Sequence, residues 1–155
     1  MNIIGPTLNR EQEVEAILRS LPRWFGIEEA LTRYVADSAV KPTFAAEIEN
    51  ELAGFVSLTR HFPESWELHC IAVMANRRNA GVGSALLDHA ERFAQSEGAR
   101  FLQVKTVAHT SPSTAYAETR KFYEAKGFSP VEIFPELWNP RNPALQLIKV
   151  IVAGN

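Results

Sequence analysis

The chain has a single cysteine, no long apolar run and almost no excess charge. Because Cys70 has no cysteine partner among the 155 residues, an internal disulfide is excluded, which favours a reducing compartment. No apolar run approaches the roughly 18 residues of a membrane-spanning helix, and residues 1–6 lack the basic and apolar parts of a signal peptide. A net charge of −2 provides no basic surface for nucleic acid. We therefore expect a cytoplasmic protein that binds neither membranes nor nucleic acid.

Motifs of metal-dependent and serine-hydrolase chemistry are missing as well. The chain's four histidines, at positions 61, 69, 89 and 109, show neither H-E-x-x-H nor another metal-ligand spacing. No G-x-S-x-G nucleophile elbow occurs. Cys70 is then most simply a small core residue, and as strand neighbours His69 and Cys70 are expected to face opposite ways. We expect no metal site.

The remaining composition is that of one ordinary globular domain. Hydrophobic residues make up 46% and charged residues 22% of the chain. A chain of this length can bury roughly two thirds of its unfolded surface. No repeat or linker-like segment interrupts it, so we expect a single domain over residues 1–155.

Apolar periodicity and turn residues predict alternating helices and strands. Strands are expected at 2–7, 43–48, 52–59, 66–73, 101–107, 128–134 and 145–152, and helices around 14–21, 27–34, 82–94 and 113–125. A proline-rich stretch, 135–143, is expected to separate the last two strands, and Asn50 to take a positive φ in a hairpin turn. This order, β-α-α-β-β-β-α-β-α-β-β, predicts an α/β (α+β) fold, an open mixed sheet of about seven strands with helices on both faces.

The most informative segment joins the predicted strand 66–73 to the helix that follows. It reads Arg77-Arg78-Asn79-Ala80-Gly81-Val82-Gly83-Ser84. Gly81 and Gly83 leave no side chain to block a ligand, so the first N–H groups of the helix can bind an anion at the positive end of the helix dipole. Arg77 and Arg78 add positive charge. The segment therefore predicts a phosphate-binding loop.

Two common phosphate-binding motifs do not fit this loop. G-x-G-x-x-G needs glycine at position 86, where the chain has Leu86, and a Walker loop needs Gly-Lys-Ser/Thr, which is absent. The remaining pattern, R-x-x-G-x-G from Arg78 to Gly83, resembles the pyrophosphate-binding motif of the GNAT superfamily of acyl-CoA-dependent N-acetyltransferases. A second segment, Phe122-Tyr123-Glu124-Ala125-Lys126-Gly127-Phe128, resembles the F-Y-x-x-x-G-F run of the same superfamily. The predicted element order is also similar to the GNAT fold over nearly the whole chain.

The resemblance implies how acetyl-CoA would bind. The pyrophosphate would lie on the N–H groups of residues 79–84, and the pantetheine arm along Ile71-Ala72-Val73, where it can pair with strand backbone. A backbone N–H near Val73 would polarise the thioester carbonyl. Many family members have an asparagine seven residues before the motif tyrosine that contacts the arm. This chain has Tyr116 there, whose hydroxyl either replaces that contact or leaves it unmade.

The resemblance also implies an acid and a base. Tyr123 would protonate the leaving thiolate; the alternative is that it is only an aromatic core residue. Glu67 occupies the position, counted back from the glycine motif, where the histone-acetyltransferase branch carries its catalytic glutamate. His69 is expected on the same strand face as Glu67, Ile71 and Val73, and imidazole is a common base near neutral pH. Either could act through a water. The alternative is that Glu67 only faces solvent and His69 is only a half-buried strand residue.

Trp24 and Phe25 form an aromatic corner that is expected either to line an acceptor pocket or to pack in the core. Together these patterns predict an N-acetyltransferase that moves an acetyl group from acetyl-CoA to a primary amine of a small molecule or peptide in a ternary complex. The sequence does not select the acceptor. A non-catalytic acyl-CoA-binding domain is one alternative, although it would need neither Tyr123 nor Glu67. A partner-binding subunit, for example a homodimer, is another.

Overall fold

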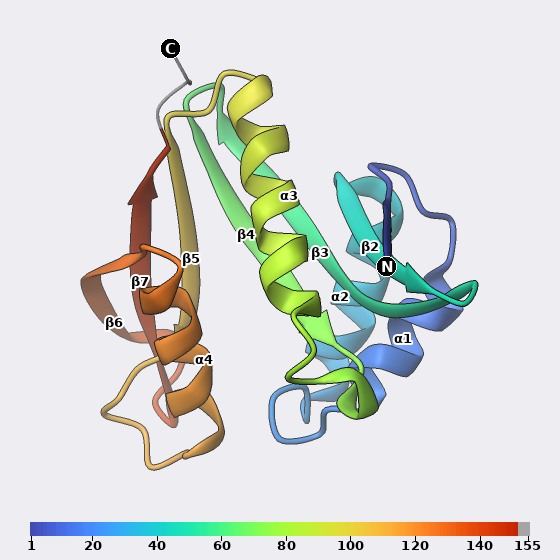
Figure 1. The fold of residues 1–155 in the computed structure, drawn as a ribbon. Helices are drawn as coiled ribbons and strands as arrows, with labels where there is room; N and C mark the ends of the chain where they lie inside the picture. Colours follow the sequence, from blue (N-terminus) through green and yellow to red (C-terminus); the bar gives the residue numbers. More distant parts are fainter. Residues whose placement is uncertain (152–155) are drawn as a thin grey trace.

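A seven-stranded sheet with the order β1-β2-β3-β4-β5-β7-β6 forms the centre of the computed structural model, which describes residues 1–151 (Figure 1). The strands are β1 (Asn2–Ile4), β2 (Thr43–Ile48), β3 (Glu51–Phe62), β4 (Ser65–Val73), β5 (Phe101–Val107), β6 (Ser129–Asn139) and β7 (Asn142–Val150). The helices are α1 (Glu11–Arg19), α2 (Glu28–Val40), α3 (Val82–Ser96) and α4 (Ala115–Ala125), with a 3₁₀ turn η1 (Ala75–Arg77). This order confirms the predicted fold class.

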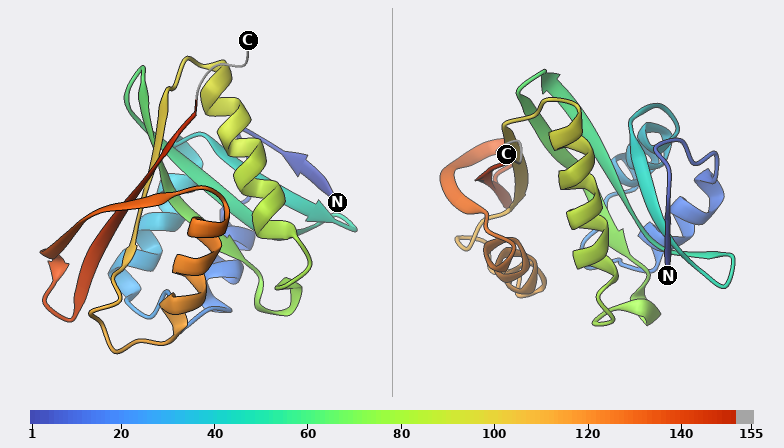
Figure 2. Two further views of the ribbon diagram at one scale, coloured as in Figure 1. Left: turned by 60° about the vertical axis from the view of Figure 1, so that its left-hand side comes forward. Right: turned by 45° about the horizontal axis from the view of Figure 1, so that its top comes forward.

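Helices cover both faces of the sheet. Figure 1 and Figure 2 show α3 and α4 on one face, and α1 and α2 on the other. Each pair of helices has its own apolar core, built around Leu86 of α3 on one side and Ile17 of α1 on the other, both 0% exposed. None of the helices within residues 1–151 combines the length and the apolar character needed to cross a membrane.

The two central strands, β4 and β5, separate partway along the sheet. They pair in parallel only where residues 65–68 lie beside 101–104. Beyond that point β4 continues along β3 to Val73, while β5 continues along β7 to Val107 (Figure 1). Within the described chain, the edge of β4 that faces β5 therefore has no ladder partner beyond Leu68. Unpaired strand backbone of this kind is available to bind a ligand.

A glycine on β3 fixes where α3 begins. A Cβ at Gly54 would lie 2.8 Å from the carbonyl oxygen of Ala72 and 3.1 Å from Cγ1 of Val82. Only glycine therefore lets the first turn of α3 approach the β3–β4 pair this closely. From Val82 onward each turn of the helix buries one or two side chains, which gives α3 one apolar face.

Several boundaries differ from the predictions. Helix α1 ends at Arg19 and α2 begins at Glu28, both close to the predicted bounds. Ile27 precedes α2 in an extended conformation and is 56% exposed, so it does not contribute to the buried face of that helix. Glu49 and Asn50 both take positive φ in the β2–β3 turn, as predicted for Asn50. The strand predicted at 2–7 ends at Ile4, and the last one ends at Val150; position 152 lies outside the described residues.

The proline-rich stretch 135–143 is not a separating loop. Most of it belongs to a β6–β7 hairpin, in which Asn139 pairs with Asn142 and its side-chain Oδ1 accepts the N–H of Arg141 at 3.0 Å. Pro135 is tolerated because β6 is the edge strand, so a missing N–H costs no ladder bond on its open side, whereas Pro140 lies in the turn and Pro143 is the second residue of β7.

Candidate active site

The glycine loop leaves the first N–H groups of α3 free. Asn79 and Gly81 have left-handed backbone conformations, with φ of 63° and 81°, and Gly81 is the N-cap of α3 without a capping side chain. Ala85 is the first residue of the helix to donate, to the carbonyl of Gly81 at 3.1 Å. The N–H groups of residues 82–84 have no acceptor among residues 1–151. Free N–H groups at a helix N-terminus are able to bind an anion, which is the geometry that a phosphate-binding loop requires.

Gly83 connects this loop to the separated strands. A Cβ on Gly83 would lie 3.6 Å from Cγ2 of Val73 and 3.6 Å from the ring of Phe122. The bare glycine therefore faces the space between the end of β4 and α4. A ligand held at the N-terminus of α3 can continue from here toward the edge of β4.

Two arginines of the loop lie in different surroundings. The guanidinium of Arg78 stacks on Trp24, with Cζ 4.4 Å from the ring centroid, and also lies 3.5 Å from a carboxylate oxygen of Glu118. Arg77 ends η1, and its side chain makes no hydrogen bond or ion pair with any residue that the structure describes. Ala80 is exposed between the left-handed residues.

Lys126 is a third cation near the loop, and sequence reasoning missed it. Its Nζ donates to Oγ of Ser84 at 2.9 Å and to Oδ1 of Asp88 at 2.5 Å, so it joins the end of α4 to the first turn of α3. Lys126 occupies a variable position of the F-Y-x-x-x-G-F run. Neither periodicity nor motif indicated that it would reach the loop.

Tyr123 lies on the buried face of α4, close enough to Cys70 of β4 for the two groups to interact electrostatically. Its side chain is 4% exposed, and its ring packs edge-on against Phe128. Burial raises the pKa of the phenol, and nearby Cys70 and Tyr34 raise it further. Among the described residues its hydroxyl has no hydrogen-bond partner. The phenol therefore stays protonated and is free to donate.

A β-bulge at His69 changes which residues share a face of β4. Ser57 pairs with Cys70 and Leu58 with Leu68, so His69 is an extra residue on β4. Before the bulge Glu67 faces the side of α2. After it, Ile71 and Val73 pack against the core under α3, while Cys70 and Ala72 pack under α1.

Two predictions about this strand were therefore wrong. Glu67 and His69 do not share a face with Ile71 and Val73, because the bulge shifts the alternation by one residue. His69 and Cys70 do not face opposite ways, since both contact the layer of α1 and α2. Cys70 itself is buried, as predicted, and its burial raises the pKa of the thiol.

Lys105 and His61 hold the carboxylate of Glu67. Lys105 Nζ donates to Oε2 at 2.9 Å, and His61 Nε2 lies 2.6 Å from Oε1. The Glu67 side chain is 14% exposed. Both oxygens are therefore engaged, which holds the carboxylate in place at the point where β4 and β5 separate.

His69 makes a single polar contact. Its Nε2 lies 2.7 Å from Oδ2 of Asp37 on α2, and its ring meets the edge of Tyr34 at a centroid distance of 5.3 Å. Its other ring nitrogen has no partner within residues 1–151. Burial raises the pKa of Tyr34 to about 12, so this hydroxyl also stays protonated.

The aromatic corner divides between the two sides of the site. Trp24 reaches α4, where its Nε1 donates to Thr119 Oγ1 at 3.2 Å and its carbonyl accepts from the Tyr116 hydroxyl at 2.9 Å. Phe25 instead meets Tyr34 of α2, with ring centroids 5.8 Å apart. Tyr116, which stands where many family members have asparagine, thus uses its hydroxyl proton to hold Trp24.

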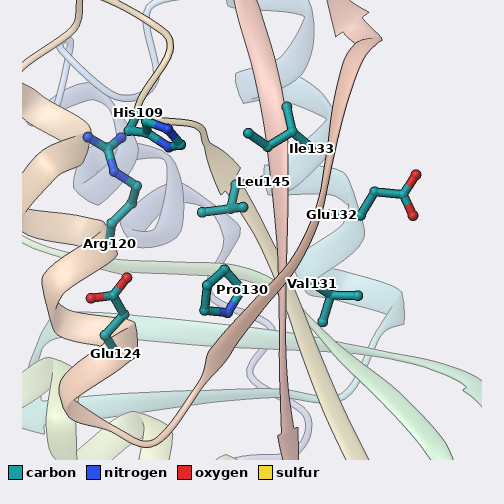
Figure 3. A pocket seen from close by; sticks show the side chains of 8 residues that line it. All are labelled: His109, Arg120, Glu124, Pro130, Val131, Glu132, Ile133 and Leu145. Atoms are coloured by element: carbon teal, nitrogen blue, oxygen red, sulfur yellow. The ribbon is translucent and has the colours of Figure 1, made fainter.

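A cavity of about 490 Å³ lies elsewhere, between α4 and β6 (Figure 3). Figure 3 shows His109 beside Arg120 at one end and Glu124 further along the helix. None of the residues predicted for the site lines this cavity. Histidine, cysteine and acidic side chains in residues 1–151 form no group of three that could hold a metal ion.

Comparisons with known proteins agree with this architecture. Residues 11–128 match the model of the acetyltransferase (GNAT) family. Among curated proteins, none matches the chain. A GNAT-family acetyltransferase structure from Desulfovibrio desulfuricans has a TM-score of 0.85 at 21% identity, covering 97% of this chain and 99% of that one. An aminoglycoside 6'-N-acetyltransferase complexed with coenzyme A has a TM-score of 0.78 at 21% identity, covering 100% and 99%.

A third structure extends the likeness to another acceptor type. The ribosomal-protein-S18-alanine N-acetyltransferase from Escherichia coli has a TM-score of 0.74 at 18% identity, covering 99% of this chain and 97% of that one. These likenesses concern the fold, whereas the family match spans most of the sequence. The chain belongs to the acetyltransferase (GNAT) family.

Proposed function

We propose that the protein is an N-acetyltransferase that moves an acetyl group from acetyl-CoA to a primary amine by direct transfer in a ternary complex. One observation carries the proposal. The unpartnered N–H groups of the α3 first turn lead, past the bare Gly83, to the open edge of β4 and to the buried hydroxyl of Tyr123. An anion site, an extended slot and a proton donor follow one another as a long thioester cofactor requires.

The pyrophosphate would bind at the start of α3. Residues 79–84 supply backbone N–H groups and the positive end of the dipole, and Arg77, Arg78 and Lys126 supply charge. The pantetheine arm would then pair with the free edge of β4 at Ile71-Ala72-Val73. A similar structure holds coenzyme A, which supports this use of the fold.

The acetyl carbonyl would lie near the end of β4. A free N–H close to Val73 would stabilise the developing oxyanion, and such a donor is worth about 2.7 to 4 kcal/mol in other enzymes. Tyr123 would donate to the sulfur as the carbon–sulfur bond breaks. Because burial raises the pKa of this phenol, it acts first as a hydrogen-bond donor and releases its proton only when negative charge has accumulated on the thiolate.

The acceptor amine must lose a proton before or during attack. An alkyl ammonium with a pKa of about 10.4 costs about 4.6 kcal/mol to deprotonate at pH 7. Glu67 and His69 are the candidate bases. Glu67 can accept a proton, directly or through a water, only if Lys105 or His61 releases one of its oxygens, whereas His69 keeps one ring nitrogen free. The geometry therefore favours His69, with Glu67 as the alternative.

A thiol-release assay with acetyl-CoA and a panel of amines tests the proposal. The panel includes aminoglycosides and a peptide with N-terminal alanine, because two similar structures are named for these acceptors. We expect thiol release that depends on one class of amine, together with calorimetric binding of CoA. CoA binding without turnover on any amine would favour the acyl-CoA-binding domain instead. Failure to bind CoA would contradict both readings.

A further inference from the structure

Trp24 joins the loop between α1 and α2 to Arg78 and to α4. Its ring carries the Arg78 guanidinium at 4.4 Å, and its indole N–H and backbone carbonyl both bond to α4. The neighbouring Arg23 donates to Oγ1 of Thr114, the N-cap residue of α4, at 3.2 Å. The loop between α1 and α2 is thus tied at several points to α4 and to the glycine loop.

The stacked arrangement leaves Arg78 able to bind an anion. A guanidinium that lies over an aromatic ring keeps its N–H donors pointing outward in its own plane, where they can grip a phosphate. Its only other polar contact within residues 1–151 is a 3.5 Å approach to Glu118, whose side chain is 77% exposed. A contact this long and exposed yields readily to a phosphate oxygen.

We propose that Trp24 is a positioning residue for the cofactor: its ring is the platform that holds Arg78 beside the N-terminus of α3, in the place where the pyrophosphate of acetyl-CoA binds. The inference rests on the proposed function, since it assumes the same cofactor site. Cofactor binding is then also expected to affect the α1–α2 loop, because Trp24 joins that loop to Arg78 and, through Tyr116, to α4.

A side chain flexible in solution loses rotamer freedom when it binds a ligand. A prior stack on a half-buried indole removes that cost in advance, so the platform strengthens binding by preorganisation rather than by touching the ligand. Cation–π contacts of this kind correspond to an effect of about 3- to 30-fold in affinity.

A double-mutant cycle in CoA affinity, measured by calorimetry, tests the proposal. Trp24→Leu and Arg78→Met are each expected to weaken CoA binding about 3- to 30-fold. The double variant is expected to bind no more weakly than Arg78→Met alone, because the platform acts only through the arginine. Additive losses, or a Trp24→Leu protein that binds CoA as tightly as wild type, would overturn the inference.

Two control variants separate the platform from its surroundings. Trp138→Leu removes a 45% exposed tryptophan of β6 and is expected to leave CoA affinity unchanged. Thr119→Val removes only the hydrogen bond to the indole, and it is expected to weaken binding less than Trp24→Leu does. An equal loss in Thr119→Val would mean that the docking of the loop, and not the ring beneath Arg78, is what matters, and the platform would be rejected.

A measurement without a disruptive mutation covers the case in which Trp24→Leu fails to fold. In protein labelled with 5-fluorotryptophan, CoA is expected to shift the ¹⁹F resonance of Trp24 and not that of Trp138, and Arg78→Met is expected to abolish the shift. An unmoved Trp24 resonance under saturating CoA would reject the platform. If the wild-type protein does not bind CoA, the proposed function fails as well; if it does, only this inference is at stake.

Discussion

Lys105 Nζ donates to Glu67 Oε2 at 2.9 Å, and this ion pair crosses the sheet where β4 and β5 separate. The last ladder pair before the separation is Leu68 with Val104, so Lys105 is the first residue of β5 beyond it. Both side chains are largely buried, at 24% and 14% exposed. The pair therefore holds together the closed end of the opening that the proposed cofactor would enter. The pair also occupies one oxygen of the Glu67 carboxylate, which the sequence indicated as a candidate base.

Replacing the true base should change the pH profile of kcat/KM and not only its height. We expect His69→Gln to depress kcat/KM most near neutral pH and to recover partly at high pH, where the amine arrives deprotonated. Glu67→Gln is expected to lower activity evenly across pH, because it disturbs the Lys105 and His61 contacts. Acceptors of different pKa are needed to separate the enzyme's base from the amine's own ionisation.

The opposite pair of profiles would return the role to Glu67. An even loss in both variants would mean that neither side chain takes the proton and that the amine binds already neutral.

Tyr123→Phe should lower kcat and leave CoA affinity nearly intact. The phenylalanine ring keeps the packing against Phe128, and only the donor to the sulfur is lost. General acids are typically worth about 10²- to 10⁴-fold in rate. Single-turnover kinetics with calorimetry checks both parts. Tyr116→Phe is the matched control for the rate on the same helix, because its hydroxyl holds Trp24 and is not a candidate acid, so any effect is expected in CoA affinity and not in kcat. A Tyr123→Phe enzyme with the wild-type rate would show that water protonates the thiolate.

Gly83→Asp should abolish CoA binding while preserving the fold. The new side chain would enter the space between Val73 and Phe122, and its charge would oppose the pyrophosphate. A carboxylate in the first turn is otherwise favourable to the helix dipole, so stability should not fall. Gly83→Asn adds the same bulk without charge, and comparing the two Kd values separates steric from electrostatic exclusion. Unchanged affinity in a folded Gly83→Asp protein would contradict the assignment of the loop.

Local patterns predicted the glycine loop because its chemistry is contained in a few adjacent residues. Left-handed backbone at Gly81 and free N–H groups at the start of α3 both follow from the residue types at those positions. Apolar periodicity likewise predicted a helix around 82–94, where α3 lies. The same periodicity predicted the order of helices and strands, and this order was sufficient to predict the fold class.

Features that depend on distant residues were not predictable in this way. The bulge at His69 arises from the register between β3 and β4, and no residue of β4 indicates this register in the sequence. Because of the bulge, Ile71 and Val73 lie on the opposite face of the sheet from the one predicted. Lys126, the C-cap residue of α4, reaches Ser84 in the first turn of α3. Arg78 found its ring partner, Trp24, on a loop more than fifty residues away in sequence. Each of these needs the sheet to be assembled before the contact exists.

The stability of the protein should decline in alkali, beginning near pH 9. Burial raises the pKa of the Cys70 thiol from an ordinary value of 9.0, and it raises the pKa of the Tyr123, Tyr34 and Tyr116 phenols from 10.0. Between the ordinary and the raised values the folded chain keeps protons that the unfolded chain has lost. Unfolding then releases protons, so the free energy of unfolding falls as pH rises, by up to about 1.4 kcal/mol per pH unit for each such group.

The groups can be told apart by where the decline begins. At pH 7 both states hold all of these protons, and the thiol and phenols contribute no pH dependence. Between pH 9 and 10 Cys70 dominates, and the tyrosines join above pH 10. Urea unfolding of Cys70→Ala is therefore expected to show a flatter decline from pH 9 to 10, whatever the variant loses in overall stability. Tyr34→Phe is the matched control, because it should leave that interval unchanged and flatten the curve only above pH 10. An unaltered slope in Cys70→Ala would mean that the thiol ionises in the folded state, and Cys70 would then be an accessible nucleophile beside Tyr123 instead of an inert core residue.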